Sequence, residues 1–350
     1  MKSPIRVLLV DDSNFICYHV TKHLESAPGL QVVGTANNGL EALNQIKTLR
    51  PDVVVLDIEM PRLDGLSTLR RIMAECPTPV IMFSVLTQRG ARATIQAMMM
   101  GAVDFVRKPE AKEAVYTVVE ELAAKIKAAV GTQLTKLSSA ETAPLTQPAK
   151  LGLQRFQKGD RIIVIGASTG GPRALQAILS QLPADIPAAV LVVQHMPSGF
   201  THSLAQRLHQ MSAVRVQEAA DGDRLARGLV LLAPGDYHLC LTKTGQVRLN
   251  QGPRRHYVRP SVDVTMESAV ESFGSAVIGV ILTGMGNDGT DGAKYIKDAG
   301  GKVVAEDEST TIVNGMPLSA IEAGWVDQVA PLPKIAPIIL KLVKNGTAGV

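Results

Sequence analysis

Cysteine is scarce in this 350-residue chain, and long apolar runs are missing. The three cysteines, Cys17, Cys76 and Cys240, lie far apart and without C-x-x-C spacing, which excludes a disulfide framework and a zinc site. A reducing cytoplasm is therefore the expected location. No run of about 18 apolar residues occurs, and Asp11 and Asp12 interrupt the first apolar run too early for a signal peptide. These absences predict a protein that is neither exported nor inserted into a membrane.

An excess of charge of one sign is also missing. The chain has 36 Lys and Arg against 32 Asp and Glu, a net charge of +4. Domains that bind nucleic acids usually carry a marked basic excess. This near balance of basic and acidic residues argues against DNA or RNA as a partner. The hydrophobic residues, 46% of the chain, suffice for packed cores.

A stretch without periodicity divides the chain. Residues 131–157 are rich in Thr, Ser, Ala, Gln and Pro and show neither helical nor alternating apolar spacing. A loop inside one domain is the alternative, but so long an irregular loop is unusual in a compact domain. We predict a first domain over residues 1–125, a linker over 126–157 and a second domain over 158–347.

Continuous apolar runs predict parallel sheets in both domains. Such runs, separated by helical patterns, indicate strands buried on both faces. The expected strands are residues 6–10, 31–36, 52–58, 79–84 and 103–106 in the first domain, and 161–165, 189–193 and 277–282 in the second. Short runs and turn residues over 214–249 predict an antiparallel hairpin addition. The expected fold class is α/β, with two doubly wound parallel-sheet domains.

Polar side chains end several strands of the first domain. Asp11 and Asp12 follow the first strand and Asp57 ends the third, so their carboxylates would meet at the carboxyl edge and suit Mg²⁺. Ser84 and Lys108 add a hydroxyl and an ammonium group to the same edge. A single Asp more often caps a helix. Five such residues at strand ends instead favour a site that accepts a phosphoryl group on a carboxylate.

The motifs VLLVDDS, VVLDIEMPRLDGL and DFVRKP, with a serine at the end of the fourth strand, resemble the receiver domain of bacterial two-component response regulators. The resemblance covers residues 5–125. It implies a flavodoxin-like fold with strand order 2-1-3-4-5. It also implies that Asp57 is phosphorylated by a sensor histidine kinase, that Lys108 pairs with the phosphate, and that Ser84 and Phe105 form the switch.

The same resemblance implies the metal ligands of the first domain. Phosphorylation would require Mg²⁺ as a cofactor. Asp12, Asp57 and the backbone carbonyl of Glu59 would bind the ion, with Asp11 acting through water.

A G-x-S-x-G pattern over residues 166–170 lies between the first strand and the first helix of the second domain. Ser168 would project at the carboxyl edge, where the helix N-terminus offers amide donors to an oxyanion. A Gly-rich phosphate cradle and a helix N-cap serine are the alternatives. A dinucleotide-binding fingerprint fails because the third glycine is misplaced and no acid ends the next strand.

The next strand ends instead in His195, and the run over 277–282 leads to Asp288. A lone histidine is usually structural. Here Ser168, His195 and Asp288 would share one sheet edge, as nucleophile, base and orienting carboxylate. Asp291 is a competing acid that spacing alone does not exclude. The chain order Ser-His-Asp differs from the Ser-Asp-His order of α/β-hydrolases.

The motifs GASTGGP, VVQHMP, RPSVDV and LTGMGNDG resemble the catalytic domain of chemotaxis protein-glutamate methylesterases over residues 160–345. The resemblance implies that Ser168, His195 and Asp288 form the catalytic triad. They would hydrolyse glutamate methyl esters on methyl-accepting chemotaxis receptors and deamidate certain glutamines, without a cofactor for the hydrolysis. Joined to a receiver, this domain would be a phosphorylation-regulated hydrolase for sensory adaptation.

The sequence also offers candidate donors to the oxyanion and a candidate basic surface that could steer the substrate. The backbone amide of Thr169 is a candidate donor from its place at the helix start, and that of Met285 from the family likeness. The segment GPRRHYVRP concentrates Arg254, Arg255 and Arg259. These side chains are either solvated loop charges or a basic rim that steers acidic receptor helices.

Two other functional classes compete with the hydrolase. A binding adaptor without turnover is disfavoured by the complete Ser-His-Asp set. A DNA-binding regulator is disfavoured because residues 158–350 carry 18 basic and 17 acidic side chains.

Overall fold

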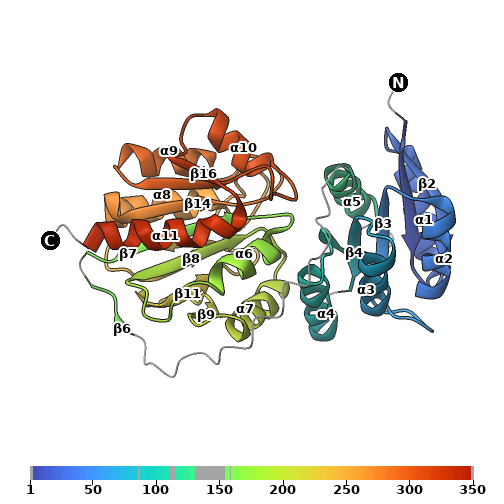
Figure 1. The fold of residues 1–350 in the computed structure, drawn as a ribbon, viewed down its shortest axis with the longest axis horizontal. Coiled ribbons are helices and arrows are strands. Elements are labelled where there is room, and N and C mark those ends of the chain that lie inside the picture. The colour runs from blue at the N-terminus through green and yellow to red at the C-terminus, as the bar shows by residue number, and fades with distance from the viewer. Residues whose placement is uncertain (1–2, 86, 110–114, 131–153, 158, 348–350) are drawn as a thin grey trace. The chain divides into compact units, whose positions relative to one another are not determined.

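The protein is described from a computed structural model that covers residues 3–85, 87–109, 115–130, 154–157 and 159–347. The chain divides into two compact units, Met1–Ala140 and Glu141–Val350 (Figure 1). Each unit contains a parallel sheet covered by helices on both faces, as the apolar runs predict. Among the described residues, no helix has the length and apolar character needed to cross a membrane.

In the part of the first unit that the structure describes, there are five parallel strands and five helices. The strands are β1 (Ile5–Val10), β2 (Leu30–Ala36), β3 (Val53–Asp57), β4 (Val80–Ser84) and β5 (Asp104–Arg107). The helices are α1 (Asn14–Ser26), α2 (Gly39–Leu49), α3 (Gly65–Glu75), α4 (Gln88–Met99) and α5 (Val115–Ala129). The sheet order β2-β1-β3-β4-β5 confirms the flavodoxin-like order. Helix α1 packs against α5, while α3 packs against α2 and α4.

Side-chain caps fix where the first four helices begin. Each is preceded by a residue whose side-chain oxygen accepts a hydrogen bond from a backbone amide in the first turn, which satisfies a donor that the helix leaves unpaired. These capping residues are Ser13, Asn38, Asp64 and Thr87. The helices therefore start close to the carboxyl edge of the sheet, where the polar residues gather.

Helix and strand structure extends into both ends of the predicted linker. Helix α5 continues to Ala129, past the predicted boundary at residue 125, because Ile126 and Ala129 still face the core and are buried. At the other end, β6 (Gln154–Arg155) pairs antiparallel with β10 (Ala226–Arg227) of the second unit. Residues 131–153, the rest of the predicted linker, lie outside the described residues.

The main sheet of the second unit has seven strands among the described residues. They are β7 (Arg161–Ala167), β8 (Ala188–Gln194), β9 (Arg215–Glu218), β11 (Leu229–Leu232), β14 (Val277–Ile281), β15 (Lys302–Glu306) and β16 (Gln328–Ala330). Their order is β16-β15-β14-β7-β8-β11-β9, and all neighbours are parallel.

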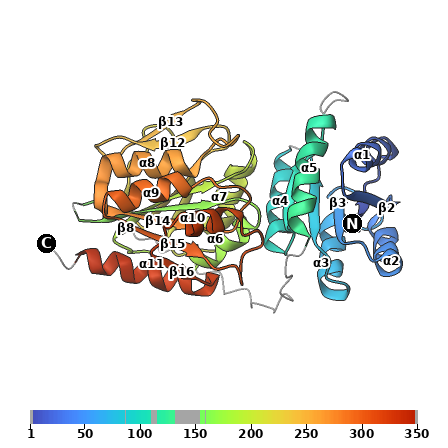
Figure 2. The ribbon, with the colours of Figure 1, turned by 90° about the horizontal axis from the view of Figure 1, so that it is seen from above.

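Helices cover both faces of the second sheet. One face carries α6 (Gly171–Leu179), α7 (Phe200–Gln210) and α11 (Leu332–Thr347). The other carries α8 (Val262–Phe273), α9 (Thr290–Asp298) and α10 (Gly315–Glu322), with a short 3-10 turn at Gly274–Ala276. Figure 2 shows α11 on one side of the sheet and α8 and α9 on the other.

The antiparallel addition is smaller than the sequence predicts. Strands β12 (His238–Leu241) and β13 (Val247–Asn250) form the expected hairpin, which packs against α8. The prediction was wrong for the earlier run, because β11 lies inside the parallel sheet between β8 and β9. Every residue of β11 is buried, as a strand covered on both faces requires.

The strand order reverses beside β7. From β7 the chain proceeds to β8 on one side and returns later to β14 on the other. Such a reversal opens a crevice at the carboxyl ends of the two central strands, where doubly wound folds bind ligands. Ser168 directly follows β7.

Candidate functional site

Lys108 joins two predicted carboxylates at the carboxyl edge of the first sheet. Its Nζ lies 2.6 Å from Asp11 Oδ2 and 2.8 Å from Asp57 Oδ2. One ligand oxygen each from Asp11, Asp12 and Asp57 fall within 4.8 Å of one another. The backbone amide of Glu59 donates a 3.4 Å bond to Asp57 Oδ1, so the loop that carries the Glu59 carbonyl lies against this cluster. The structure thus brings the predicted acidic residues together.

The electrostatics of this cluster fit a divalent cation. Burial raises the pKa of the Asp57 carboxyl to about 6, even though Lys108 opposes the shift. Lys108 pairs with Asp11 and Asp57, two of the three carboxylates, so the cluster of Asp11, Asp12 and Asp57 keeps excess negative charge. An all-oxygen donor set of this kind suits Mg²⁺.

The two predicted switch residues are both buried. Thr94 donates a 2.8 Å hydrogen bond to Ser84 Oγ. The Phe105 ring lies under Lys125, whose Nζ is 5.4 Å from the ring centroid and donates a 2.6 Å bond to the Phe105 carbonyl. Sequence reasoning missed Lys125 and Thr94. The lysine could have been noticed as a charge within the apolar pattern of α5.

Magnesium binding to the full chain should weaken as the pH falls through about 6. Because the pKa of Asp57 is raised, protons compete with the cation for this carboxylate already in mildly acidic solution. We expect about fourfold weaker binding at pH 5.5 than at pH 7.5, measured by isothermal titration calorimetry. The variant Asp57→Asn should bind more weakly and lack this pH dependence. Equal wild-type affinities at both pH values would contradict the expectation.

His195 and Asp288 meet at the carboxyl edge of the second sheet. His195 Nε2 lies 2.8 Å from Asp288 Oδ2. The His195 backbone amide donates to the carbonyl of Ala167, and the Ser168 amide donates to the carbonyl of Thr283 beyond β14. These bonds hold Ser168 and His195 on adjacent strand ends. With Nε2 bonded to the carboxylate, Nδ1 is the ring nitrogen left to exchange a proton with the serine.

The N-terminus of α8 binds the Asp288 carboxylate. Oδ1 accepts hydrogen bonds from Ser261 Oγ at 2.8 Å and the Asp263 amide at 3.1 Å, and Oδ2 accepts one from the Val262 amide at 2.7 Å. Burial raises the pKa of Asp288, but the bonds from His195 and the helix amides outweigh it and lower the pKa. The buried side chain therefore stays a carboxylate, as a triad requires.

Asp291, the acid that the sequence left as an alternative to Asp288, faces Arg255 and not His195. Asp291 is exposed, and its Oδ2 lies 2.9 Å from Arg255 Nη2. The structure therefore places Asp288, not Asp291, against His195.

Asp263 fixes the loop that carries Asp288, a role that sequence reasoning missed. Its buried Oδ1 accepts the backbone amides of Gly289 at 2.9 Å and Gly292 at 2.7 Å, which ties the starts of α8 and α9 together. The available signal was the RPSVDV motif, in which Asp263 follows an N-cap serine by two residues.

Small residues allow close packing around Ser168. A Cβ atom on Gly284 would lie 2.7 Å from Ser168 Cβ, so the loop toward Met285 passes directly beside the serine. Thr283 Oγ1 donates a 3.0 Å bond to the carbonyl of Thr169. The N-cap of α6 is Gly170, at φ 79°, so the alternative of an N-cap serine at Ser168 is wrong.

The three arginines of the GPRRHYVRP segment are paired with acids. Arg254 and Arg259 bind Asp236 at 3.0 and 2.7 Å, and Arg255 binds Glu267 at 2.7 Å. These contacts favour a structural role for the arginines over a free basic rim.

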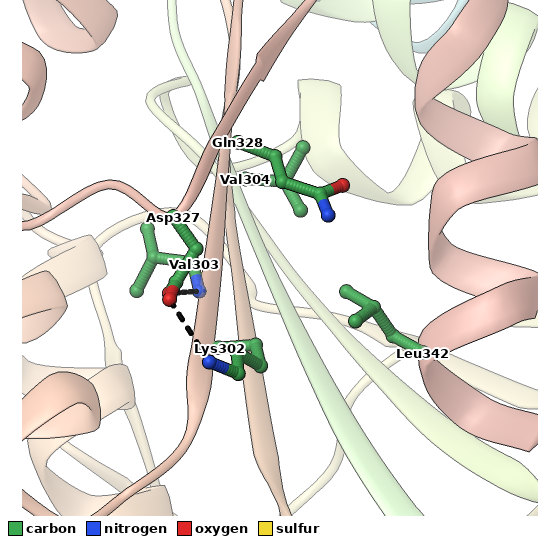
Figure 3. Close-up of a pocket in the computed structure, with 6 residues that line it drawn as sticks. All are labelled: Lys302, Val303, Val304, Asp327, Gln328 and Leu342. Atoms are coloured by element: carbon green, nitrogen blue, oxygen red, sulfur yellow. Dashed lines mark hydrogen bonds and ion pairs between the residues drawn. The ribbon is translucent and has the colours of Figure 1, made fainter. Parts of the chain in front are cut away.

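A small pocket at the amino end of β15 is separate from these residues (Figure 3). Lys302 Nζ and the Val303 amide both donate to the Asp327 carboxylate, at 3.1 and 2.8 Å, and Leu342 lies across from them. The predicted catalytic residues lie at the opposite end of the strands. The pocket therefore has no part in the candidate site.

Comparison with known families matches both units. Residues 7–120 match the response regulator receiver domain, and residues 163–339 match the CheB methylesterase family. Relatives named protein-glutamate methylesterase/protein-glutamine glutaminase occur in Symbiobacterium thermophilum, 49% identical over 99% of both chains, and in Archaeoglobus fulgidus, 45% identical over 97% of this chain and 98% of that one. The crystal structure of the Thermotoga maritima CheB methylesterase catalytic domain is 50% identical, with a TM-score of 0.51, and covers 53% of this chain and 99% of that chain.

Proposed function

Because the chain belongs to the protein-glutamate methylesterase/protein-glutamine glutaminase family, with a receiver domain in front, we propose that Ser168, His195 and Asp288 perform its hydrolysis. The observation that carries this assignment is the 2.8 Å bond from His195 Nε2 to Asp288, on the strand end next to Ser168. Methanol release from methylated chemoreceptor membranes, compared between the wild type and Ser168→Ala, tests it.

The reaction follows from the positions of these groups. Ser168 Oγ attacks the ester carbonyl carbon while His195 Nδ1 takes the hydroxyl proton. The backbone amides of Thr169 and Met285 are the proposed donors to the oxyanion. The intermediate collapses, His195 returns the proton to the leaving methoxide, and methanol departs. Water then attacks the acyl-enzyme with His195 as base, which releases glutamate and restores Ser168; from a glutamine substrate, ammonia leaves in place of methanol.

The receiver unit supplies the regulation. We propose Asp57 as the phosphorylation site, with a sensor histidine kinase as donor and chemoreceptors as the substrate of the second unit. Asp12, Asp57 and the Glu59 carbonyl would hold Mg²⁺, supported by Asp11, and the ion would neutralise charge on the incoming phosphoryl group. The three cysteines are free, as in a reducing compartment, and the cytoplasm is the proposed location.

Replacing Asp57 with alanine should remove the response to a phosphodonor. The variant loses the acceptor oxygen but leaves the second unit unchanged, so its basal rate should persist. We expect acetyl phosphate with Mg²⁺ to increase methanol release by the wild type and to leave Asp57→Ala unaffected. The exposed residue Asp64 provides a control, because Asp64→Asn keeps a capping oxygen and should still respond. A response in Asp57→Ala equal to that of the wild type would assign phosphorylation to another residue.

A further inference from the structure

Tyr257 stands out among the exposed side chains of the second unit. It is 96% exposed, whereas its neighbour His256 is half-buried. The two residues form the tip of a tight turn, in which the amides and carbonyls of Arg255 and Val258 bond reciprocally at 3.2 and 3.0 Å. A tyrosine ring this exposed buries almost no apolar surface on folding. A contribution to the stability of the second unit therefore does not explain why a tyrosine occupies this position.

The backbone of this turn is unfavourable for its residues. His256 and Tyr257 have φ values of 50° and 64°. Both central positions of such a two-residue turn favour Gly, Asn or Asp, and positive φ is rare for a bulky aromatic residue. Strained residues of this kind persist where surrounding contacts hold them, and they cluster at functional sites.

The contacts that hold this turn lead to the candidate triad. His256 Nε2 bonds to Asp263 Oδ2 at 2.9 Å, and the Asp263 amide bonds to the Asp288 carboxylate. Arg255 bonds to Glu267 on α8. The position of Tyr257 is therefore fixed relative to His195 and Asp288.

Other exposed apolar side chains lie on loops at the carboxyl edge of the second sheet, where Ser168 and His195 lie. Met285 is 44% exposed on the loop after β14 and follows Gly284, which packs against Ser168. Tyr237 is 38% exposed on the loop after β11. Tyrosine and methionine are enriched in the parts of protein surfaces that bind other proteins. An enzyme that hydrolyses an ester on a substrate protein must contact the segment of that protein around the ester.

We propose that Tyr257 is a substrate-docking residue, whose ring packs against apolar side chains of the receptor segment that flanks the methyl ester. The proposal rests on the proposed function, since it takes Ser168 as the reacting centre. The strained turn presents the ring in one place, so little side-chain freedom remains to be lost on binding.

Kinetics on methylated chemoreceptor membranes with the full-length chain test the proposal. We expect Tyr257→Ala to raise KM about tenfold while kcat changes less than about twofold, because a docked aromatic ring contributes mainly to binding. Tyr257→Phe should keep the wild-type KM, since the ring supplies the contact. Tyr295→Ala is the matched control: this tyrosine is 48% exposed on α9 and should have no effect.

A second measurement separates docking from support of the triad. The labelling rate of Ser168 by a small fluorophosphonate probe should be the same in Tyr257→Ala and wild type. Tyr257→Gly, which suits the positive φ, should fold and show the same rise in KM.

Several outcomes would overturn the inference. An unchanged KM would exclude docking, and equal losses of labelling and turnover would make Tyr257 a support of the triad. Higher activity of unphosphorylated Tyr257→Ala would indicate that the ring contacts the receiver of its own chain. A wild type that is not labelled at Ser168 would instead overturn the proposed function.

Discussion

Ser168→Ala should abolish methyl-ester hydrolysis, with a loss of turnover on the order of 10⁴ to 10⁶. The variant removes the attacking oxygen and leaves His195 without a proton to accept. The fold should survive, because the backbone of Ser168 holds this residue in place and the substitution leaves the backbone bonds intact. Its amide donates to Thr283, and its carbonyl accepts from the Gly171 amide and from Gln194 Nε2 at 2.8 Å.

Methanol release from methylated chemoreceptor membranes, together with thermal unfolding, measures this loss. Ser198→Ala is a suitable control, because Ser198 is an exposed serine on the loop just after His195 and should keep nearly full activity. Adding His195→Ala to Ser168→Ala should reduce the rate little further, since residues that act as one unit are strongly non-additive. A Ser168→Ala enzyme that retains about a tenth of the wild-type rate would exclude the serine as nucleophile.

The order of the first sheet was predicted from the resemblance to receiver domains, whereas the strands themselves, including the central strands of the second sheet, could be predicted because their apolar runs are continuous. Such runs identify strands that helices cover on both sides, and the residue after each strand then falls at a known edge. Ser168 and His195 were located in this way. The run at Leu229–Leu232 was misassigned because a short apolar strand has the same pattern in a hairpin as in the centre of a sheet.

Spacing alone could not exclude Asp291 in favour of Asp288, because the difference between them lies in long-range contacts; the family resemblance implied Asp288. Asp288 and Asp291 are three positions apart in the same loop and helix start. What separates them is the N-terminus of α8, which binds Asp288, and Arg255, which binds Asp291. For the same reason the arginines of the 254–259 segment looked like free charge. Asp236, the partner of Arg254 and Arg259, lies in another loop, and no local pattern connects it to them.

Asp288→Asn should lower turnover by about 10⁴, the second large effect that we expect, because the substitution changes the contacts of this side chain. Both carboxylate oxygens accept hydrogen bonds, Oδ1 from Ser261 Oγ and the Asp263 amide, and Oδ2 from the Val262 amide and His195 Nε2. Asparagine offers only one accepting oxygen. If its NH₂ group takes the Oδ2 position, it faces the Val262 amide and forces His195 Nε2 to accept a hydrogen bond. The ring proton then moves to Nδ1, the nitrogen that must take the proton of the serine.

The opposite orientation of the asparagine preserves the histidine tautomer but places the NH₂ group against the Asp263 amide. Either orientation leaves a buried backbone amide of α8 without its acceptor, which should destabilise the second unit by about 1 to 3 kcal/mol. We therefore expect Asp288→Asn to lower both turnover and melting temperature. Asp291→Asn, on an exposed side chain that binds Arg255, should change turnover less than about threefold. If both variants are folded at the assay temperature and Asp291→Asn is the more impaired, then the carboxylate that orients His195 during turnover is not Asp288.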